Sequence, residues 1–228
     1  MSIADETEGA EGAERARIYG FLAGVFFSTP TEESARDLSR MTLTLGIACP
    51  DGPTLAELDR DFMDLFVVPN PRYVAPYESA YRDSWLLPLE PGQGTTPQTI
   101  GRLLMGESTA AMRQCFLDAG VLPSQDLPDH FGNELRLMSH LCIDEDQGSG
   151  HQESRRELRT KVLNEHLLKW IGPLRQSVLE NERVGFYSAA LEVVEAVLRD
   201  DPLCAIPAGP GSFTGGSGVG DHAFLRPA

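Results

Sequence analysis

Basic residues are scarce in this chain. Its 228 residues include 34 Asp and Glu but only 19 Lys and Arg, giving a formal net charge of −15, and Lys161 and Lys169 are the only lysines. Nucleic-acid binding depends on clustered Lys and Arg that neutralise phosphates, so a nucleic-acid partner is disfavoured. The negative charge would suit a basic partner, such as an arginine-bearing peptide, and it is equally consistent with solubility or adaptation to salt.

Closely spaced cysteines and long apolar runs are also lacking. Cys49, Cys115, Cys142 and Cys204 are far apart and no C-x-x-C spacing occurs, which disfavours a structural zinc site. Residues 1–14 are acidic and lack the apolar run of a signal peptide, and no segment reaches the roughly 20 apolar residues of a membrane helix. We therefore expect buried thiols in a reducing cytoplasm.

Apolar residues instead recur at helical spacing along most of the chain. Thr54 and Glu57 have the spacing of a capping box, and apolar residues follow on one helical face up to Phe66. Thr29-Pro30 resembles the cap of an earlier helix. Other helices are expected at about 14–27, 97–105, 108–119, 129–144, 163–174 and 186–198. No convincing alternating strand pair occurs, so the sequence predicts an all-α domain of about eight to ten helices.

The composition divides the chain into three parts. Residues 1–13 are acidic and small and are expected to fray, residues 14–202 hold the helical domain, and residues 203–228 form a Gly- and Pro-rich tail. Within the domain, residues 69–97 are rich in Pro, Gly and aromatic residues. Such a long connection is either a packed loop or a binding surface.

The stretch LPDHFGNEL at 127–135 could be a metal site, half of a catalytic triad or a helix cap. A triad lacks its nucleophile, because no G-x-S-x-G occurs. A di-iron site lacks its Glu-x-x-His pairs, because neither Glu134 nor Glu165 has a histidine three residues later, and H-E-x-x-H is absent. The residues therefore favour a cap formed by Asp129 behind Pro128, with His130 in the first helical turn.

Several segments together resemble the TorD/DmsD/NarJ-type chaperones that mature molybdenum oxidoreductases. The resemblance covers about residues 15–200 and rests on segments that occur in the family's order. They are Leu65-Phe66-Val67-Val68-Pro69, Pro76-Tyr77-Glu78-Ser79-Ala80-Tyr81, Leu104-Met105-Gly106-Glu107-Ser108-Thr109, Asp126-Leu127-Pro128-Asp129-His130 and Glu165-His166-Leu167-x-x-Trp170 with Phe186-Tyr187. Asp126 stands where Glu is frequent, and Phe131 replaces a commoner aliphatic residue.

The resemblance implies a cytoplasmic, cofactor-free helical chaperone without enzymatic turnover. Its expected partner is the catalytic subunit of a molybdopterin oxidoreductase, bound before export, together with that subunit's twin-arginine signal peptide. The resemblance also implies that the fold can exchange helices between subunits, so the chain is either a monomer or a helix-exchanged dimer, for which residues 146–150 are a candidate hinge.

A receptor for a twin-arginine peptide needs a rim of carboxylates and an apolar groove. Glu78, Asp126 and Asp129 are candidates for the rim. The full set of expected client-binding residues is Leu65, Phe66, Tyr77, Glu78, Tyr81, Trp85, Asp126, Pro128, Asp129, His130 and Phe131. For each apolar member the alternative is packing in the core, which is favoured for Leu65 and Phe66.

One further residue has an expected role, and two alternative functions remain. His166 lies on an apolar helical face and is expected to be a buried, hydrogen-bonded structural histidine. A metal-dependent helical enzyme could use His130, His140 and nearby carboxylates. A general helical adaptor would bind another protein without preference for an arginine pair.

Overall fold

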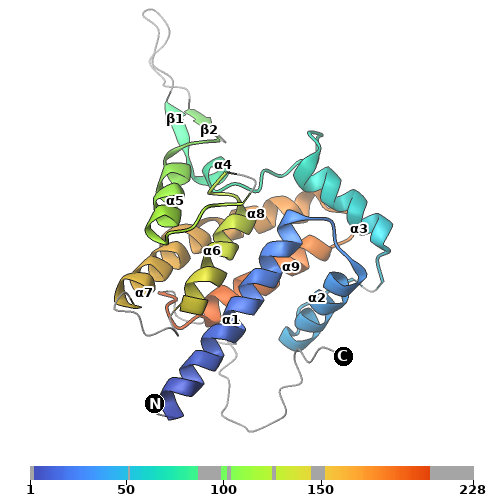
Figure 1. Cartoon of the computed structure of the whole chain (residues 1–228). Coiled ribbons are helices and arrows are strands. Elements are labelled where there is room, and N and C mark those ends of the chain that lie inside the picture. The colour runs from blue at the N-terminus through green and yellow to red at the C-terminus, as the bar shows by residue number, and fades with distance from the viewer. Residues whose placement is uncertain are drawn as a thin grey trace, which may run out of the picture.

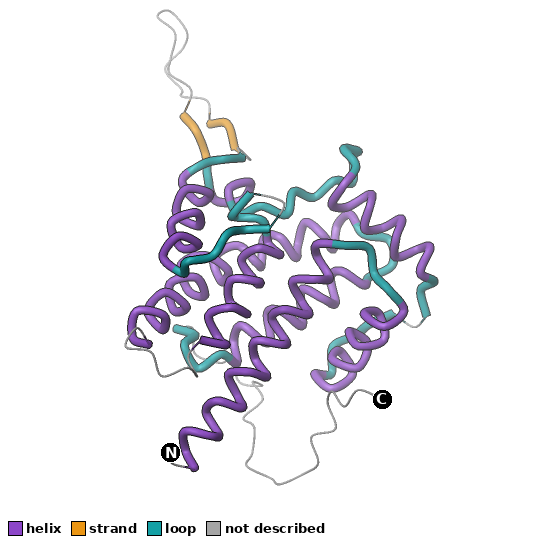
Figure 2. Tube along the Cα trace, viewed as in Figure 1, coloured by secondary structure: helices purple, strands orange, loops and turns teal. Residues whose placement is uncertain are grey.

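The computed structural model describes residues 3–50, 52–86, 99–101, 104–124, 127–144 and 152–205. Helices account for most of these residues, and the strands form one short pair (Figure 2). The α-helices are α1 (Ile3–Phe27), α2 (Glu32–Leu45), α3 (Leu55–Phe62), α4 (Ser79–Arg82), α5 (Glu107–Asp118), α6 (Phe131–Asp144), α7 (Gln152–Lys161), α8 (Leu168–Asn181) and α9 (Phe186–Asp200). Two π-helical segments, η1 (Met63–Val67) and η3 (Val162–Leu167), continue α3 and α7. The predicted all-α class is confirmed.

The core forms where the longer helices cross. Helix α1 runs along α6, and α9 packs against α8 and α2 (Figure 1). Aromatic side chains from three of these helices meet edge to face: the ring of Phe131 lies 4.9 Å from that of Phe26 and 5.2 Å from that of Trp170. Such edge-to-face pairs are the favoured geometry for aromatic packing. The crossing of α1, α6 and α8 therefore fixes the base on which residues 127–131 rest.

Local capping signals are confirmed where the partner lies within one turn. The Thr54 hydroxyl accepts from the backbone N–H of Glu57 at 3.3 Å, and the Glu57 carboxylate accepts from the N–H of Thr54 at 2.9 Å. Helix α2 is capped by Thr31 with Ser34, so the predicted cap at Thr29 was wrong by two residues. The reason is that the Thr31 side chain, not that of Thr29, reaches the third amide of α2.

Two expectations about secondary structure were wrong. Helix α1 begins at Ile3, so residues 3–13 continue the helix that was expected to start at Glu14. Residues 99–101 are not helical: they form strand β2 (Thr99–Gly101), which pairs antiparallel with β1 (Ser84–Leu86). The β-branched residues Thr99 and Ile100 suit an extended chain, and three-residue strands are too short to show alternation in a sequence.

The apolar face predicted for residues 163–174 is confirmed, and it runs through η3 into α8. Leu163, Leu167 and Trp170 are completely buried, and His166 is buried with them. Of the other expected regions, the hinge at 146–150 and most of the C-terminal tail, residues 206–228, lie outside the described residues.

Candidate functional site

The segment that holds Pro76-Tyr77-Glu78 and the segment that holds Asp129-His130-Phe131 lie side by side. Residues 76–78 and 129–131 pair as an isolated antiparallel bridge centred on Tyr77 and His130. The N–H of Glu78 donates to the carbonyl of Asp129 at 2.9 Å, and the N–H of Phe131 donates to the carbonyl of Pro76 at 2.8 Å. This pairing brings the start of α4 and the start of α6 together.

Asp129 caps a helix, but not the helix that the sequence predicted. Its side chain is fully buried, and Oδ2 accepts from the backbone N–H of Ser79 at 3.0 Å. Ser79 is the first residue of α4, which has no side-chain cap of its own. A carboxylate at a helix N-terminus satisfies an orphan N–H and interacts favourably with the helix dipole. Asp129 therefore joins α4 to the segment before α6.

His130 takes the capping role at α6 that was assigned to Asp129. Its ring nitrogen Nδ1 accepts from the N–H of Gly132 at 3.1 Å, and its carbonyl accepts from the N–H groups of Asn133 and Glu134. An Nδ1 that accepts a hydrogen bond carries no proton, so this geometry assigns the neutral Nε2–H tautomer to His130. The imidazole is thereby held in one orientation.

Two aromatic rings enclose the imidazole of His130. The ring of Phe27 stacks on it at 5.0 Å with an interplanar angle of 14°, and the ring of Tyr77 meets it edge-on at 5.3 Å. Phe27 and Tyr77 are partly exposed, whereas His130 is only 4% exposed. We call Phe27, Tyr77 and His130 the aromatic patch. The aromatic patch therefore presents apolar ring surface to solvent, and Tyr77 adds a polar hydroxyl group to it.

Gly132 makes room for this patch. A Cβ atom at Gly132 would lie 2.7 Å from Cε2 of Phe27, which is closer than real Cβ contacts come. Sequence reasoning missed both Phe27 and Gly132. A glycine in the first turn of a predicted helix was the available signal, because glycine there weakens a helix unless something approaches closely.

Glu78 is an internal ion-pair partner. Its carboxylate is fully buried, contacts Nδ1 of His166 at 2.7 Å through Oε2, and accepts from Arg82 through Oε1. Arg82 also donates to the carbonyl of Glu165 at 2.6 Å. These contacts confirm that His166 is a buried, hydrogen-bonded histidine. They also remove Glu78 from any exposed rim in this conformation.

Glu134 is a buried acid that sequence reasoning did not single out as part of the site. Its Oε2 accepts from Nε1 of Trp170 at 3.1 Å, while Oε1 has no hydrogen-bond partner within the described part of the chain. Burial raises the pKa of Glu134 well above its usual value, and the nearby Glu78 charge raises it further, against the opposing effect of the Trp170 hydrogen bond. Burial therefore favours the protonated form of Glu134 inside the core.

Asp83 ties a third motif segment to the same region. Its carboxylate accepts from the N–H of Ser108 at 2.9 Å and from the Ser108 hydroxyl at 2.8 Å, which caps α5. A Cβ atom at Gly106 would collide with Asp83, so this close approach requires glycine. Segments 76–83, 104–109 and 127–134 are thus linked by carboxylates that bond to distant backbone amides.

The other expected contact residues lie in different surroundings. Leu65 and Phe131 are completely buried and Phe66 is 9% exposed, so all three belong to the core. Pro128 is buried, and Tyr81 is partly exposed with its ring 5.5 Å from that of Trp170. Trp85 lies in β1 opposite Ile100, but its side chain is outside the described part, as is Asp126 altogether.

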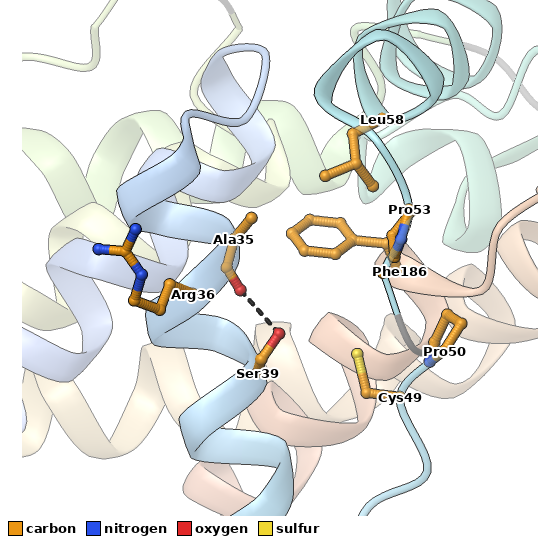
Figure 3. Close-up of a pocket in the computed structure, with 9 residues that line it drawn as sticks. Ala35, Arg36, Ser39, Cys49, Pro50, Pro53, Leu58 and Phe186 are labelled. Atoms are coloured by element: carbon orange, nitrogen blue, oxygen red, sulfur yellow. Dashed lines mark hydrogen bonds between the residues drawn. The ribbon is translucent and has the colours of Figure 1, made fainter.

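Two hollows flank α2 and share Phe186. The smaller hollow, about 140 Å³, lies between α2 and the loop that precedes α3 (Figure 3). Its lining includes Ala35, Cys49, Pro50 and Leu58, while the guanidinium of Arg36 points away from Phe186. The larger hollow, about 300 Å³, lies between α1 and α2. We call it the α1–α2 groove; it is lined by Gly20, Phe21, Gly24, Val25, Ser28, Thr29, Pro30, Thr31, Ser34 and Phe186.

The described residues contain no group of three His, Cys, Asp or Glu side chains placed to hold a metal ion, and His140 is partly buried in α6. Cys115 and Cys142 are buried, as expected, whereas Cys49 and Cys204 are partly exposed. Of the helices in the described ranges, none has both the length and the apolar character required to cross a membrane.

Comparison with known proteins finds one matching family and relatives that share one name. The family described as nitrate reductase delta subunit matches residues 27–176. A protein of Vibrio cholerae serotype O1 named "Chaperone protein TorD" is 26% identical over 218 residues, which covers 84% of this chain and 91% of that protein. A protein of the same name from Salmonella paratyphi B is 28% identical over 149 residues, covering 64% of this chain and 59% of that protein.

Proposed function

Because the chain belongs to the nitrate reductase delta subunit family, we propose that it is a cytoplasmic maturation chaperone for a molybdopterin-dependent oxidoreductase. Its client is the apo catalytic subunit, including the twin-arginine leader that this subunit carries before export. The chaperone holds the subunit while the cofactor is inserted and the enzyme is assembled. The named TorD chaperones that are similar over most of the chain support this proposal.

The observation that carries the proposal is the aromatic patch. Phe27 and Tyr77 offer partly exposed rings around a histidine whose orientation is fixed by the N–H of Gly132. Aromatic side chains give large contact areas at low entropic cost and are enriched at the centres of protein interfaces. The patch is also the place where the 76–81 and 127–131 motifs meet.

Co-purification from the native cytoplasm tests the function as a whole. Tagged protein should recover a molybdopterin-enzyme catalytic subunit that still carries its leader and lacks its cofactor. Recovery of the same subunit only in its mature, cofactor-loaded form would contradict a role before export. Recovery of unrelated proteins, with no preference for an arginine pair, would instead indicate a general adaptor.

A pair of variants tests the patch within that experiment. Tyr77→Ala removes one ring of the patch, and central aromatic residues at interfaces typically contribute about 2 kcal/mol or more, so the recovered subunit should fall by about tenfold or more. Tyr73→Ala truncates a partly exposed aromatic side chain in the same loop but outside the patch, and should leave recovery nearly unchanged. Equal loss in both variants would argue against the patch, provided that their melting temperatures match.

A further inference from the structure

The carboxylates of Glu78 and Asp129 are not exposed to solvent, so a basic leader peptide needs another site of recognition. Glu78 and Asp129 are both fully buried. Glu78 bonds to His166 and Arg82, whereas Asp129 bonds to Ser79 through Oδ2 and its Oδ1 has no hydrogen-bond partner within the described part of the chain. A guanidinium from solvent could reach Glu78 only by displacing its partners, and could reach Asp129 only by entering the core. An arginine-bearing client therefore needs exposed carboxylates elsewhere, beside an apolar surface.

The α1–α2 groove has apolar side chains in its lining. Phe21 and Val25 of α1 and Phe186 of α9 line it, together with the connection from Ser28 to Thr31. Gly24 leaves space in it, because a Cβ atom at this position would meet no atom within 4 Å. Its volume of about 300 Å³ is at the lower end of the range for ligand pockets, about 300–1,000 Å³. The groove could therefore anchor a few apolar side chains of a longer segment.

Exposed acidic residues adjoin the lining of this groove at the start of α2. Glu32 and Glu33, in the first turn of α2, are exposed and stand between the lining residues Thr31 and Ser34. Within the described residues, neither takes part in an ion pair. The smaller hollow on the other side of α2 is bordered instead by Arg36, whose charge would repel a basic peptide. Charge thus distinguishes the two hollows.

The groove is continuous with the aromatic patch. Phe27, the last residue of α1, stacks on His130, and the next residue, Ser28, lines the groove. A client that covers the patch is therefore beside Glu32 and Glu33 without crossing the molecule. This continuity and the exposed acidic pair favour a basic client segment over a second copy of this strongly acidic chain.

We propose that the α1–α2 groove binds the apolar stretch of the client's leader, while Glu32 and Glu33 pair with the arginines that precede it. This inference rests on the proposed function and assigns the leader to a surface outside the motif segments. The leader's apolar side chains lie on Phe21, Val25 and Phe186, and the rest of the client extends over the aromatic patch.

Peptide titration tests the groove. The probe is a synthetic peptide with an Arg-Arg pair followed by a moderately apolar stretch, titrated calorimetrically into the full-length protein. Gly24→Leu fills the groove and should weaken binding by about tenfold or more, whereas Gly24→Ala adds only a methyl group and should weaken it much less. Ala110→Leu, at an exposed position of α5, controls for an added surface leucine and should bind like wild type.

The acidic pair is tested separately. The double variant Glu32→Gln with Glu33→Gln should lower affinity and flatten its dependence on salt, because screened ion pairs are lost. The same carboxylates also favour the N-terminal dipole of α2, so Glu153→Gln, in the first turn of α7, serves as the matched control. A double variant that keeps wild-type affinity and salt dependence would overturn the assignment of the arginines.

The outcomes separate this inference from the function on which it rests. If the wild-type protein does not bind the peptide, leader binding fails, and the groove proposal fails with it. If wild type binds and Gly24→Leu binds equally well, the groove proposal alone is overturned. Circular dichroism and melting of every variant exclude misfolding, and the Glu32→Gln with Glu33→Gln variant keeps the proposal testable even if the leucine variant is unstable.

Discussion

The region of the motifs and the region around α2 differ in how tightly they are built. In segments 76–83 and 127–134, Asp129 and Glu78 are fully buried, and Asp129 bonds to an amide 50 residues away. Helix α2 buries only Leu38 and Thr42 and has a hollow on each side. Residues by which the family is recognised thus hold a surface in place, whereas the adjoining α2 is less tightly packed and borders the groove in which we propose that the leader binds.

The largest difference between the regions should appear when a buried carboxylate is removed. Glu78→Ala leaves Arg82 and His166 without their partner, and breaking a buried ion pair typically costs about 3–5 kcal/mol of unfolding free energy. Urea denaturation measures the loss. The matched control is Glu165→Ala, an exposed residue whose carbonyl still accepts from Arg82, and it should change stability by less than about 0.5 kcal/mol. Equal losses would show that Glu78 is no more important than a surface residue.

Adding one methyl group should destabilise the motif region. Gly132→Ala places Cβ against the ring of Phe27, and such overpacking typically costs about 1–3 kcal/mol. The double variant with Phe27→Ala should recover part of that loss, because the clash is gone. Thermal melting of the two single variants and the double variant gives the coupling between the residues. If the stability losses of the two single variants simply added up in the double variant, the ring of Phe27 would not be the reason that position 132 requires glycine.

The same substitution in the α1–α2 groove should have the opposite sign. Gly24 lies within α1 with open space around it, so Gly24→Ala should raise the unfolding free energy by about 0.5–1 kcal/mol through helix propensity alone. Melting measured beside Gly132→Ala makes the contrast direct. A destabilised Gly24→Ala variant would indicate that the groove is closed in solution.

A pH comparison at Glu134 tests the tightly packed motif region through titration. Its folded-state pKa is raised, so its contribution to stability is complete below the unfolded-chain pKa of about 4.3 and is lost as pH rises through the folded-state pKa. Glu134→Gln keeps an acceptor for Trp170 and removes the titration. The unfolding free energy of the variant should therefore improve relative to wild type as pH rises above about 4.3. If the unfolding free energies of wild type and variant depended on pH in the same way, the pKa of Glu134 would not differ between the folded and unfolded chain.

The sequence predicted the parts of the fold whose determinants are local. The capping box of Thr54 and Glu57 and the buried face from Leu163 to Leu174 were predictable because their partners lie within a few residues. The cap of α2 was predicted at Thr29 and lies at Thr31, so this prediction also placed the start of the helix to within two residues. The pairing of residues 84–86 with 99–101 was missed because three residues do not establish a period.

The sequence identified two segments that meet in the structure, but not the contacts that their residues make. The Asp129-His130 pair was identified, yet its two capping roles were not distinguishable, because the partner of Asp129 lies across the fold at Ser79. Glu78 could not be recognised as buried without the positions of Arg82 and His166. Phe27 entered the site only through its contact with His130, which depends on how α1 crosses α6.

Hydrogen exchange with and without the arginine-pair peptide tests the central claim most directly. The claim is that the motif carboxylates hold the site while a partner is contacted along α1 and α2. New protection is expected in the second half of α1, in the Ser28–Thr31 connection and at the start of α2, with the amides of Ser79 and Gly132 already protected in the free protein. Peptide-dependent protection confined to residues 76–82 and 127–134, with α1 and α2 unchanged, would contradict the account.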